Sequence, residues 1–334
     1  GDGNKRQATN GRSVCPPVAS AMLRSCSTLP RPRRPRTSTH PLSEGRFLTA
    51  YDVHMRIDFT KAHATGNDFV MVFDPDDALH ELAPQHVAQL CDRHFGVGGD
   101  GFIRAVPSED KGVWFMDYRN ADGSAAEMCG NGVRAFVRFL LEHGAVTLGE
   151  VDSLPIVTRA GMKHVRRLGD GFEVDLGPWR LEGGEPLVHA RGLEVARPGL
   201  GIDMGNPHVV VALASREELD ALELTSAPAI DPQPPYGANI EFVVPGEPLI
   251  REGAGHVAMR VFERGIGETL SCGTGAAATA AAVRHWAGSG APSLWYVTVP
   301  GGEVTARLDA GTDGIEHVFL GGPATLVYTG NITL

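Results

Sequence analysis

The sequence predicts an α+β fold made by internal duplication, in which two similar domains each wrap a mostly antiparallel or mixed sheet round a central buried helix. A Cys-Gly-Xaa-Gly turn that opens an apolar segment occurs twice, at Cys129 before residues 133–141 and at Cys272 before residues 276–283. Segments that are apolar nearly all round predict helices buried in a core. Many short apolar runs between glycines and polar turns predict short strands.

Residues 1–54 are predicted to be a disordered leader or a non-native upstream segment. They are rich in Arg, Pro, Ser and Thr, hold nine Lys or Arg against three Asp or Glu, and lack apolar periodicity. Such a segment buries too little apolar surface to offset chain entropy. The composition also resembles that of a transit peptide, but no amphipathic helix is visible, so upstream sequence before Met55 is the favoured interpretation.

Residues 55–196 are predicted to form the first domain. Alternating or apolar runs predict its strands, at 57–60, 69–73, 102–103, 113–116, 156–158, 165–168 and 172–176. Helical spacing predicts a helix over 84–93, and Cys91 on its apolar face is interpreted as a core residue. A polar loop over 117–124 is expected to lead to the first cysteine turn, and the buried helix that follows should end near Gly144.

Residues 197–334 are predicted to form the second domain, because they repeat the landmarks of the first. The landmarks are Asn67, Asp100 and Cys129 in the first half and Asn206, Asn239 and Cys272 in the second. The step between the first two is 33 residues in both halves, and the step from first to last is 62 residues in one and 66 in the other. Two such units facing each other would place both helix N-termini, and the active site, in the cleft between them.

Composition and charge exclude several classes of protein. The net charge of −10 argues against nucleic acid as a partner, and no apolar run reaches the roughly 18 residues of a membrane span. An odd count of five cysteines without any CxxC argues against a disulfide framework or a zinc knuckle, so reduced thiols in a cytoplasmic protein are the simpler interpretation. The glycine run 96–101 lacks the pattern of a nucleotide loop.

Paired cysteines at helix N-termini predict proton-transfer chemistry. Unpaired amides and the positive end of the helix dipole lower the pKa of a thiol there, which makes it a useful base near neutral pH. The same amides can bind a carboxylate and stabilise charge that develops beside it. Two thiols on opposite faces of one carbon could therefore invert it without a cofactor, and neither metal nor pyridoxal phosphate is expected.

The motif around the first cysteine is specific enough to carry a resemblance. Asn-Ala-Asp-Gly-Ser at 120–124, followed after four residues by Cys-Gly-Asn-Gly at 129–132 and then by Arg134, resembles the signature of diaminopimelate epimerases. The similarity covers residues 55–334 and includes four further segments, at 63–68, 205–208, 263–269 and 272–275. It implies interconversion of LL- and meso-2,6-diaminopimelate, on the route to lysine and peptidoglycan, by a cytoplasmic homodimer.

The resemblance also implies roles for individual residues. The catalytic residues would be Cys129 and Cys272 as the acid and base, assisted by His208 and Glu263. The substrate-binding residues would be Asn67, Asn120, Gly130, Asn131, Asn206, Asn239, Arg264, Gly273 and Thr274. One position departs from the pattern, because Gly101 stands where many relatives carry Gln.

Other interpretations of the same residues remain open. A proline or hydroxyproline racemase shares the two-thiol logic but needs fewer Asn and Arg side chains for its smaller substrate. A catalytically silent binding protein does not require both thiols, and a cysteine hydrolase needs a His base beside only one. An Asn in a turn often serves backbone geometry, His208 could be a satisfied core histidine, and Glu263 and Arg264 could form a surface ion pair.

Overall fold

The computed structural model describes residues 55–110, 112–150 and 152–334. The prediction for residues 1–54 therefore lies outside the described residues. The helices are α1 (Pro84–Cys91), α2 (Gly130–Glu142), α3 (Arg216–Asp220) and α4 (Gly273–Ala287). The strands up to the middle of the chain are β1 (Arg56–Ala64), β2 (Asn67–Phe73), β3 (Gly101–Pro107), β4 (Trp114–Asn120), β5 (Ser153–Thr158), β6 (Gly161–Leu168), β7 (Gly171–Pro178), β8 (Arg180–Leu181) and β9 (Leu187–His189). The remaining strands are β10 (Arg197–Asp203), β11 (Pro207–Ala212), β12 (Ala229–Asp231), β13 (Asn239–Arg251), β14 (Ala254–Glu263), β15 (Gly267–Thr269), β16 (Leu294–Val299), β17 (Gly302–Ala310), β18 (Glu316–Gly322) and β19 (Thr325–Thr333).

The two halves of the chain repeat one pattern of strand pairing, which confirms the predicted duplication. In the first half β1 pairs with β2 antiparallel, β2 with β3 parallel, β3 with β4 antiparallel, β4 with β5 parallel, and β5, β6 and β7 follow as an antiparallel meander. In the second half β10, β11, β13, β14, β16, β17 and β18 pair in the same order and with the same directions. The sheet is mixed, as predicted.

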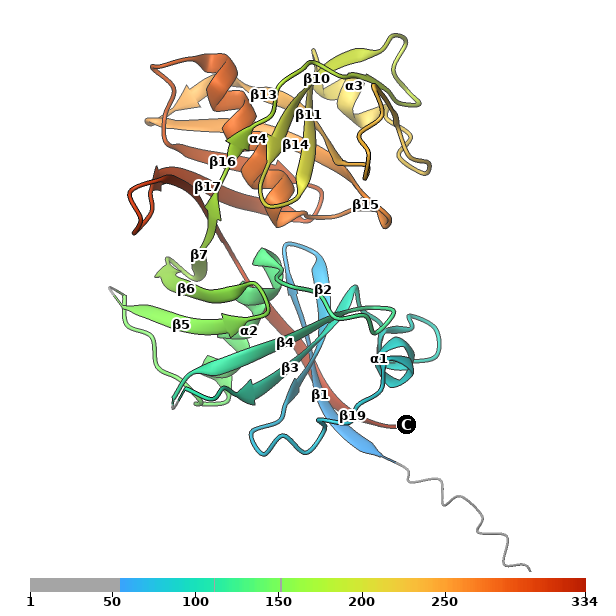
Figure 1. Cartoon of the computed structure of the whole chain (residues 1–334), viewed down its shortest axis with the longest axis vertical. Coiled ribbons are helices and arrows are strands. Elements are labelled where there is room, and N and C mark those ends of the chain that lie inside the picture. The colour runs from blue at the N-terminus through green and yellow to red at the C-terminus, as the bar shows by residue number, and fades with distance from the viewer. Residues whose placement is uncertain (1–54, 111, 151) are drawn as a thin grey trace, which may run out of the picture. The chain divides into compact units, whose positions relative to one another are not determined.

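One helix lies inside the strands of each half (Figure 1). Helix α2 contacts β1, β2, β3, β4, β7 and β19, and α4 contacts strands from β10 to β18. Every residue from Ala276 to Val283 in α4 is buried, and α2 buries Val133, Phe136 and Phe139. The two apolar segments are therefore the central buried helices that their sequences predict, and Gly288 ends α4.

Strands are exchanged between the halves at both ends of the repeat. The short β8 follows β7 but pairs with β10, and the C-terminal β19 pairs with β1 along nearly its whole length. Strands β7 and β18 pair with each other and join the two sheets. Sheet membership thus crosses from one half of the sequence to the other, and the boundaries 55–196 and 197–334 stay a prediction.

One segment differs from the sequence expectation. The stretch 117–124 was expected to be a polar loop, but β4 continues through Asp117 to Asn120 before the turn. The physical reason is that Asp117, 1% exposed, accepts hydrogen bonds from Arg104 and Arg119 at 3.2 Å each, so a buried strand can carry this charge.

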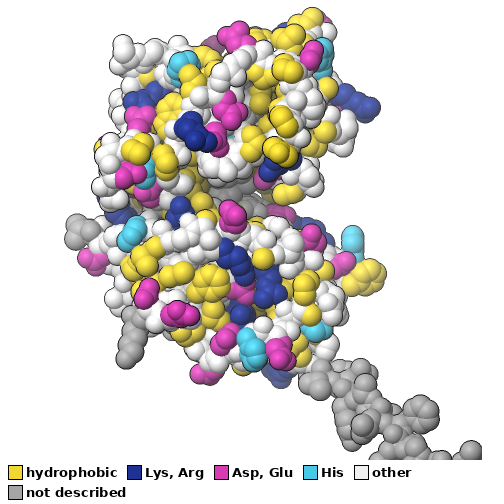
Figure 2. All heavy atoms as spheres, viewed as in Figure 1, with side chains coloured by type: hydrophobic (Ala, Val, Ile, Leu, Met, Phe, Trp, Pro, Cys, Tyr) yellow, Lys and Arg dark blue, Asp and Glu magenta, His cyan; other side chains and the backbone are white. Residues whose placement is uncertain are grey.

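The surface is mixed in charge. Basic and acidic side chains are interspersed on the face shown in Figure 2, without a broad patch of one sign. Within the described ranges, no helix is long and apolar enough to cross a membrane.

Candidate active site

Each of the two predicted cysteines is the N-cap of a central helix. Cys129 has extended backbone angles, and its sulfur accepts a hydrogen bond from the N–H of Gly132 at 3.3 Å. Cys272 makes the matching contact with the N–H of Gly275, also at 3.3 Å. These bonds satisfy one free amide at each helix start, where the positive end of the helix dipole lies. The duplication has therefore placed two thiols in equivalent positions.

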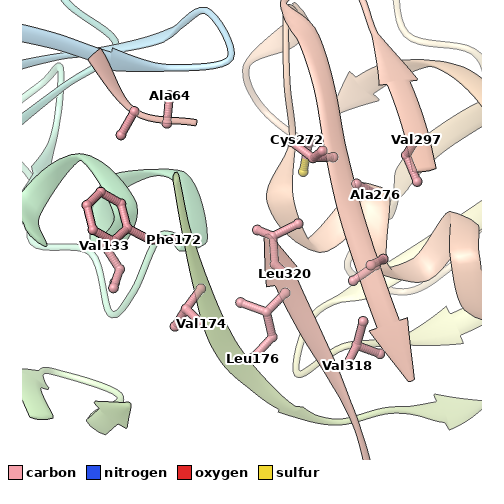
Figure 3. Close-up of a cluster of buried hydrophobic side chains, with 14 of the residues drawn as sticks. Ala64, Val133, Phe172, Val174, Leu176, Cys272, Ala276, Val297, Val318 and Leu320 are labelled. Carbon is pink, nitrogen blue, oxygen red and sulfur yellow. The ribbon is translucent and has the colours of Figure 1, made fainter. Parts of the chain in front are cut away.

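The two helix starts approach each other closely. A Cβ atom on Gly130 would lie 2.8 Å from Cδ2 of Leu320, and a Cβ atom on Gly273 would lie 2.8 Å from the same atom. Figure 3 shows Leu320 of β18 in the buried cluster that also contains Cys272 and, from β7, Leu176. A side chain at either position would therefore require the Leu320 side chain to shift.

Hydrogen bonds join the two cysteine turns directly. The Asn131 side chain donates from Nδ2 to the backbone carbonyl of Ser271 at 3.1 Å, although 140 residues separate them. The Ser271 hydroxyl lies 2.8 Å from Oγ1 of Thr65. Asn131 and Ser271 are both almost fully buried, so these bonds are shielded from water and fix one turn against the other.

Asn67 lies beside the first thiol. The sulfur of Cys129 is 3.6 Å from Oδ1 of Asn67, which accepts the thiol proton in this geometry. Nδ2 of Asn67 donates to Asp100 at 2.9 Å. Asn67 therefore contacts the other two landmarks of the first half. Its NH₂ group contacts Asp100, and its oxygen contacts Cys129.

A buried histidine occupies the corresponding region of the second half. Nδ1 of His208 lies 2.7 Å from Oε1 of Glu241, and both side chains are fully buried. Nε2 of His208 lies 3.1 Å from Oδ1 of Asn206. The other oxygen of Glu241 has no hydrogen-bond partner among the described residues. His208 is thus held by polar groups on both ring nitrogens.

Glu263 and Arg264 lie at the end of β14 and take different environments. Glu263 accepts a hydrogen bond from the Thr269 hydroxyl, while Arg264 is exposed. The backbone N–H of Arg264 donates to Oδ1 of Asn239, and its Nη1 donates to the carbonyl of Tyr236, both at 2.9 Å. The contact of the Arg264 guanidinium among the described residues is with this carbonyl and not with a carboxylate, so it can still bind an anion.

Burial dominates the electrostatics of the thiols. Burial raises the pKa of Cys129 to about 11, against the opposing hydrogen bond from the Gly132 N–H. Burial, followed by the charges of Glu263 and Glu241, raises the pKa of Cys272 well above its usual value. The expectation that the helix N-terminus lowers these pKa values is wrong for this geometry, because desolvation outweighs the dipole and the amide bonds. Burial also raises the pKa of Glu263.

Some predicted residues lie apart from this network. Asn120 bonds within its own turn, through Nδ2 to the Ser124 hydroxyl at 3.0 Å. A Cβ atom on Gly101 would lie 2.7 Å from Cε2 of Tyr118, so the tyrosine ring fills the space where a side chain would start. Thr274, in contrast, lies close to the second thiol, because its hydroxyl is 3.6 Å from the sulfur of Cys272.

Sequence reasoning missed Ser271 and Glu241. Ser271 precedes a cysteine turn directly, but nothing in the sequence shows that it faces Asn131. Glu241 had a signal, because it follows His208 by 33 residues, the same step that separates the repeated landmarks. In the described part of the chain, no group of three or more His, Cys, Asp or Glu side chains could hold a metal ion.

Comparison with known proteins supports the resemblance across both halves. The sequence model of the family described as diaminopimelate epimerase matches residues 59–181 and 201–327. A diaminopimelate epimerase of Streptomyces coelicolor is 44% identical and covers 82% of this chain and 95% of that protein. Those of Corynebacterium glutamicum and Thermobifida fusca are each 41% identical; they cover 84% and 83% of this chain, and 100% and 98% of their own lengths.

Solved structures share the fold at much lower identity. A phenazine biosynthesis protein of the PhzF family from Bacillus anthracis is 15% identical with a TM-score of 0.58, covering 84% of this chain and 100% of that one. A hydroxyproline epimerase from Agrobacterium vitis is 14% identical with a TM-score of 0.59, covering 84% and 91%. With a family match that spans both cysteine turns and relatives above 40% identity over most of their length, the chain belongs to the diaminopimelate epimerase family.

Proposed function

We propose that this protein interconverts LL- and meso-2,6-diaminopimelate by a two-thiol mechanism that uses no cofactor. The observation that carries the proposal is the pair of N-cap cysteines on two helices whose first residues, Gly130 and Gly273, pack against the same atom of Leu320. Inversion of one carbon requires a base on one face and an acid on the other. Two equivalent thiols at adjoining helix starts supply that pair.

The free amides of the two helix starts bind the reacting carboxylate in this mechanism. Residues 130–131 and 273–274 present N–H groups at the positive ends of α2 and α4. Negative charge spreads onto the carboxylate as the α-proton leaves, so donors aimed at it stabilise the transition state more than the ground state. Thr274 adds a hydroxyl beside the second thiol.

The reacting ammonium group of the substrate counteracts the raised pKa values of the two thiols. A cation bound beside a buried thiol favours the thiolate and lowers the pKa of that thiol. Glu263 holds this ammonium group, and its position near the second thiol is supported by its effect on the pKa of Cys272. His208 assists by acting on Glu263, whose pKa it affects. The thiolate then forms mainly when substrate is bound, which protects it from side reactions.

The distal amino-acid centre of diaminopimelate needs a second set of polar contacts. Arg264 binds the distal carboxylate, because its guanidinium has no carboxylate partner in the described chain and can form a bidentate contact. Asn67, Asn120, Asn206 and Asn239 complete the binding site for the amino-acid groups. A smaller substrate such as proline would leave Arg264 and these amides unused.

Incubation of the purified protein with LL-diaminopimelate in D₂O tests the proposal. The meso product should carry deuterium at the inverted carbon, while unreacted LL substrate stays mostly protonated early in the reaction. Rapid label in recovered substrate would indicate a single base instead of two. Turnover of proline or hydroxyproline with no turnover of diaminopimelate would make the protein a racemase of the smaller substrate.

We further propose that the protein works in the cytoplasm as a homodimer, which the family resemblance supports. Light scattering coupled to size exclusion measures the mass directly. A mass equal to one chain of 35.5 kDa at working concentration would contradict the dimer.

A further inference from the structure

Arg134 is a buried cation without a carboxylate partner among the described residues. It lies in the second turn of α2 and is fully buried. Its Nη2 donates to Oδ1 of Asn131 at 2.5 Å, its Nη1 donates to the carbonyl of Pro323 at 3.3 Å, and its Nε has no hydrogen-bond partner in the described chain. Burial of a guanidinium without a counter-ion carries a desolvation penalty, which indicates a role beyond packing.

The guanidinium fixes the orientation of the Asn131 side chain. Arginine has only donors, so the oxygen of the Asn131 amide must face it and the NH₂ group must face the other way. That NH₂ group donates to Oδ1 of Asn67 at 3.3 Å as well as to the carbonyl of Ser271. A flipped Asn131 would place donor against donor at Arg134 and oxygen against oxygen at Asn67.

Asp100 fixes the other end of the same chain of hydrogen bonds. A carboxylate only accepts, so it requires the NH₂ group of Asn67 to face it, at 2.9 Å. Asp100 is itself held by Nη2 of Arg93 at 2.7 Å and by the N–H of Asp68 at 3.2 Å. The relay therefore runs in one direction, from Arg134 through Asn131 and Asn67 to Asp100.

The second half of the duplication has no equivalent relay. Position 277, five residues after Cys272, is alanine where position 134, five residues after Cys129, is arginine. Glu241 and Glu263 instead place negative charge near Cys272. Among the described residues, Cys129 is thus the one cysteine whose sulfur contacts the relay directly.

We propose that Arg134 and Asp100 are positioning residues that fix the two amides between them, so that the carbonyl oxygen of Asn67 faces the Cys129 thiol. An oxygen in this place accepts from S–H, whereas a flipped amide would present N–H donors to the sulfur. The expected effect on epimerisation rests on the proposed function, and the orientation of the Asn67 amide does not.

Two matched pairs of variants test the relay at its two ends. Arg134→Lys keeps a group that only donates, and Arg134→Met keeps an unbranched side chain without donors. Asp100→Asn keeps an acceptor without the charge, and Asp100→Ala removes both. Arg138→Met is the control, because Arg138 lies one turn further along α2 and donates from its side chain to the carbonyl of Asp170, away from the relay.

The first readout is epimerisation, with melting temperatures recorded to verify folding. Arg134→Lys, Asp100→Asn and the Arg138→Met control should keep kcat/KM within about threefold of the parent, while Arg134→Met and Asp100→Ala should lose at least about tenfold, mostly in kcat. Equal activity of the Lys and Met variants at position 134 would overturn the proposal. Equal loss in Asp100→Asn and Asp100→Ala would also overturn it, since charge alone would then explain the effect.

The second readout needs no substrate and no active enzyme. Alkylation of Cys129 by iodoacetamide, measured against Cys272 by peptide mass spectrometry, should be faster in Asp100→Ala than in Asp100→Asn. Both variants lose the same charge, so a difference between their alkylation rates is not an effect of charge. It shows that the Asn67 amide, once released from position 100, donates a hydrogen bond to the sulfur of Cys129. Identical alkylation in the two would refute the relay even if Arg134→Met did not fold. The expected alkylation result without turnover of diaminopimelate by the parent would refute the proposed function and leave the relay standing.

Discussion

Replacement of Glu263 by glutamine is expected to lower the pKa of both Cys129 and Cys272. The charge of Glu263 is the largest influence after burial at Cys272, and it acts on Cys129 behind burial and the Gly132 N–H. Glutamine keeps the size and the hydrogen-bonding capacity but removes the charge. The shift should therefore be larger at Cys272 than at Cys129.

The magnitude follows from the position of the Cys129 pKa. With a value of about 11, roughly 1% of this thiol is ionised at pH 9, where a free cysteine with a pKa of about 8.5 is about three-quarters ionised. Each unit by which Glu263→Gln lowers the pKa gives about tenfold more thiolate at fixed pH. Alkylation should speed up accordingly, whereas epimerisation should slow because the ammonium group loses its counter-ion.

The assay is the pH midpoint of iodoacetamide alkylation at each cysteine, read by peptide mass spectrometry. The midpoint is preferable to an absolute rate because limited access slows alkylation at every pH. Glu268→Gln is the matched control, since Glu268 is paired with Arg260 at 2.7 Å and is not among the main influences on the pKa of either thiol. Cys91 is an internal control in the same sample, because burial, Lys61, Asp68, Arg93 and Asp100 are the main influences on its pKa and Glu263 is not among them. An unchanged or higher midpoint in Glu263→Gln, or a parent midpoint for Cys129 below 8.5, would refute the reasoning.

Three further outcomes are expected. Cys129→Ala and Cys272→Ala should each abolish epimerisation without additive effects, while Cys91→Ala retains it; near-normal turnover in either catalytic variant would contradict the two-thiol assignment. Gly273→Ala should lower the free energy of unfolding in urea by about 1–3 kcal/mol, because its Cβ would lie 2.8 Å from Leu320, and Leu320→Val should recover part of that loss. Burial raises the pKa of Cys91 to about 12, so the thiol loses its proton at a lower pH in the unfolded chain than in the folded one. The free energy of unfolding should therefore fall as the pH rises from about 8.5 towards 12. The fall should be less steep in Cys91→Ala, and equal slopes in the parent and the variant would contradict this.

Features set by local pattern were predictable from the sequence. The apolar segments after each cysteine became the buried helices α2 and α4, and the helix expected over 84–93 became α1 with Val87, Leu90 and Cys91 buried. Periodicity and glycine turns determine such elements because each residue's own preference agrees with its burial. The near-equal spacing of the landmarks predicted the internal duplication, which the repeated strand pairing confirms.

Features set by contacts between distant residues were not predictable. Nothing in the sequence shows that Asn131 faces Ser271, or that Arg134 reaches the carbonyl of Pro323. The direction of the thiol pKa values was wrong for the same reason, since burial depends on the whole fold and the helix dipole only on the local segment. The exchange of β8 and β19 left no sequence signal at all.

The pairing of β19 with β1 has a consequence for how the protein is made. Met55 and Leu334 exchange backbone hydrogen bonds at 3.2 and 3.0 Å, so the first described residue and the last are neighbours. During synthesis the outer edge of β1 therefore stays uncovered until residues 325–333 have left the ribosome. Closing a loop of this length adds little extra entropy cost per residue but slows folding, because contacts so far apart in sequence form late. A nascent chain stalled anywhere before residue 325 leaves that edge of β1 open to pairing with another chain.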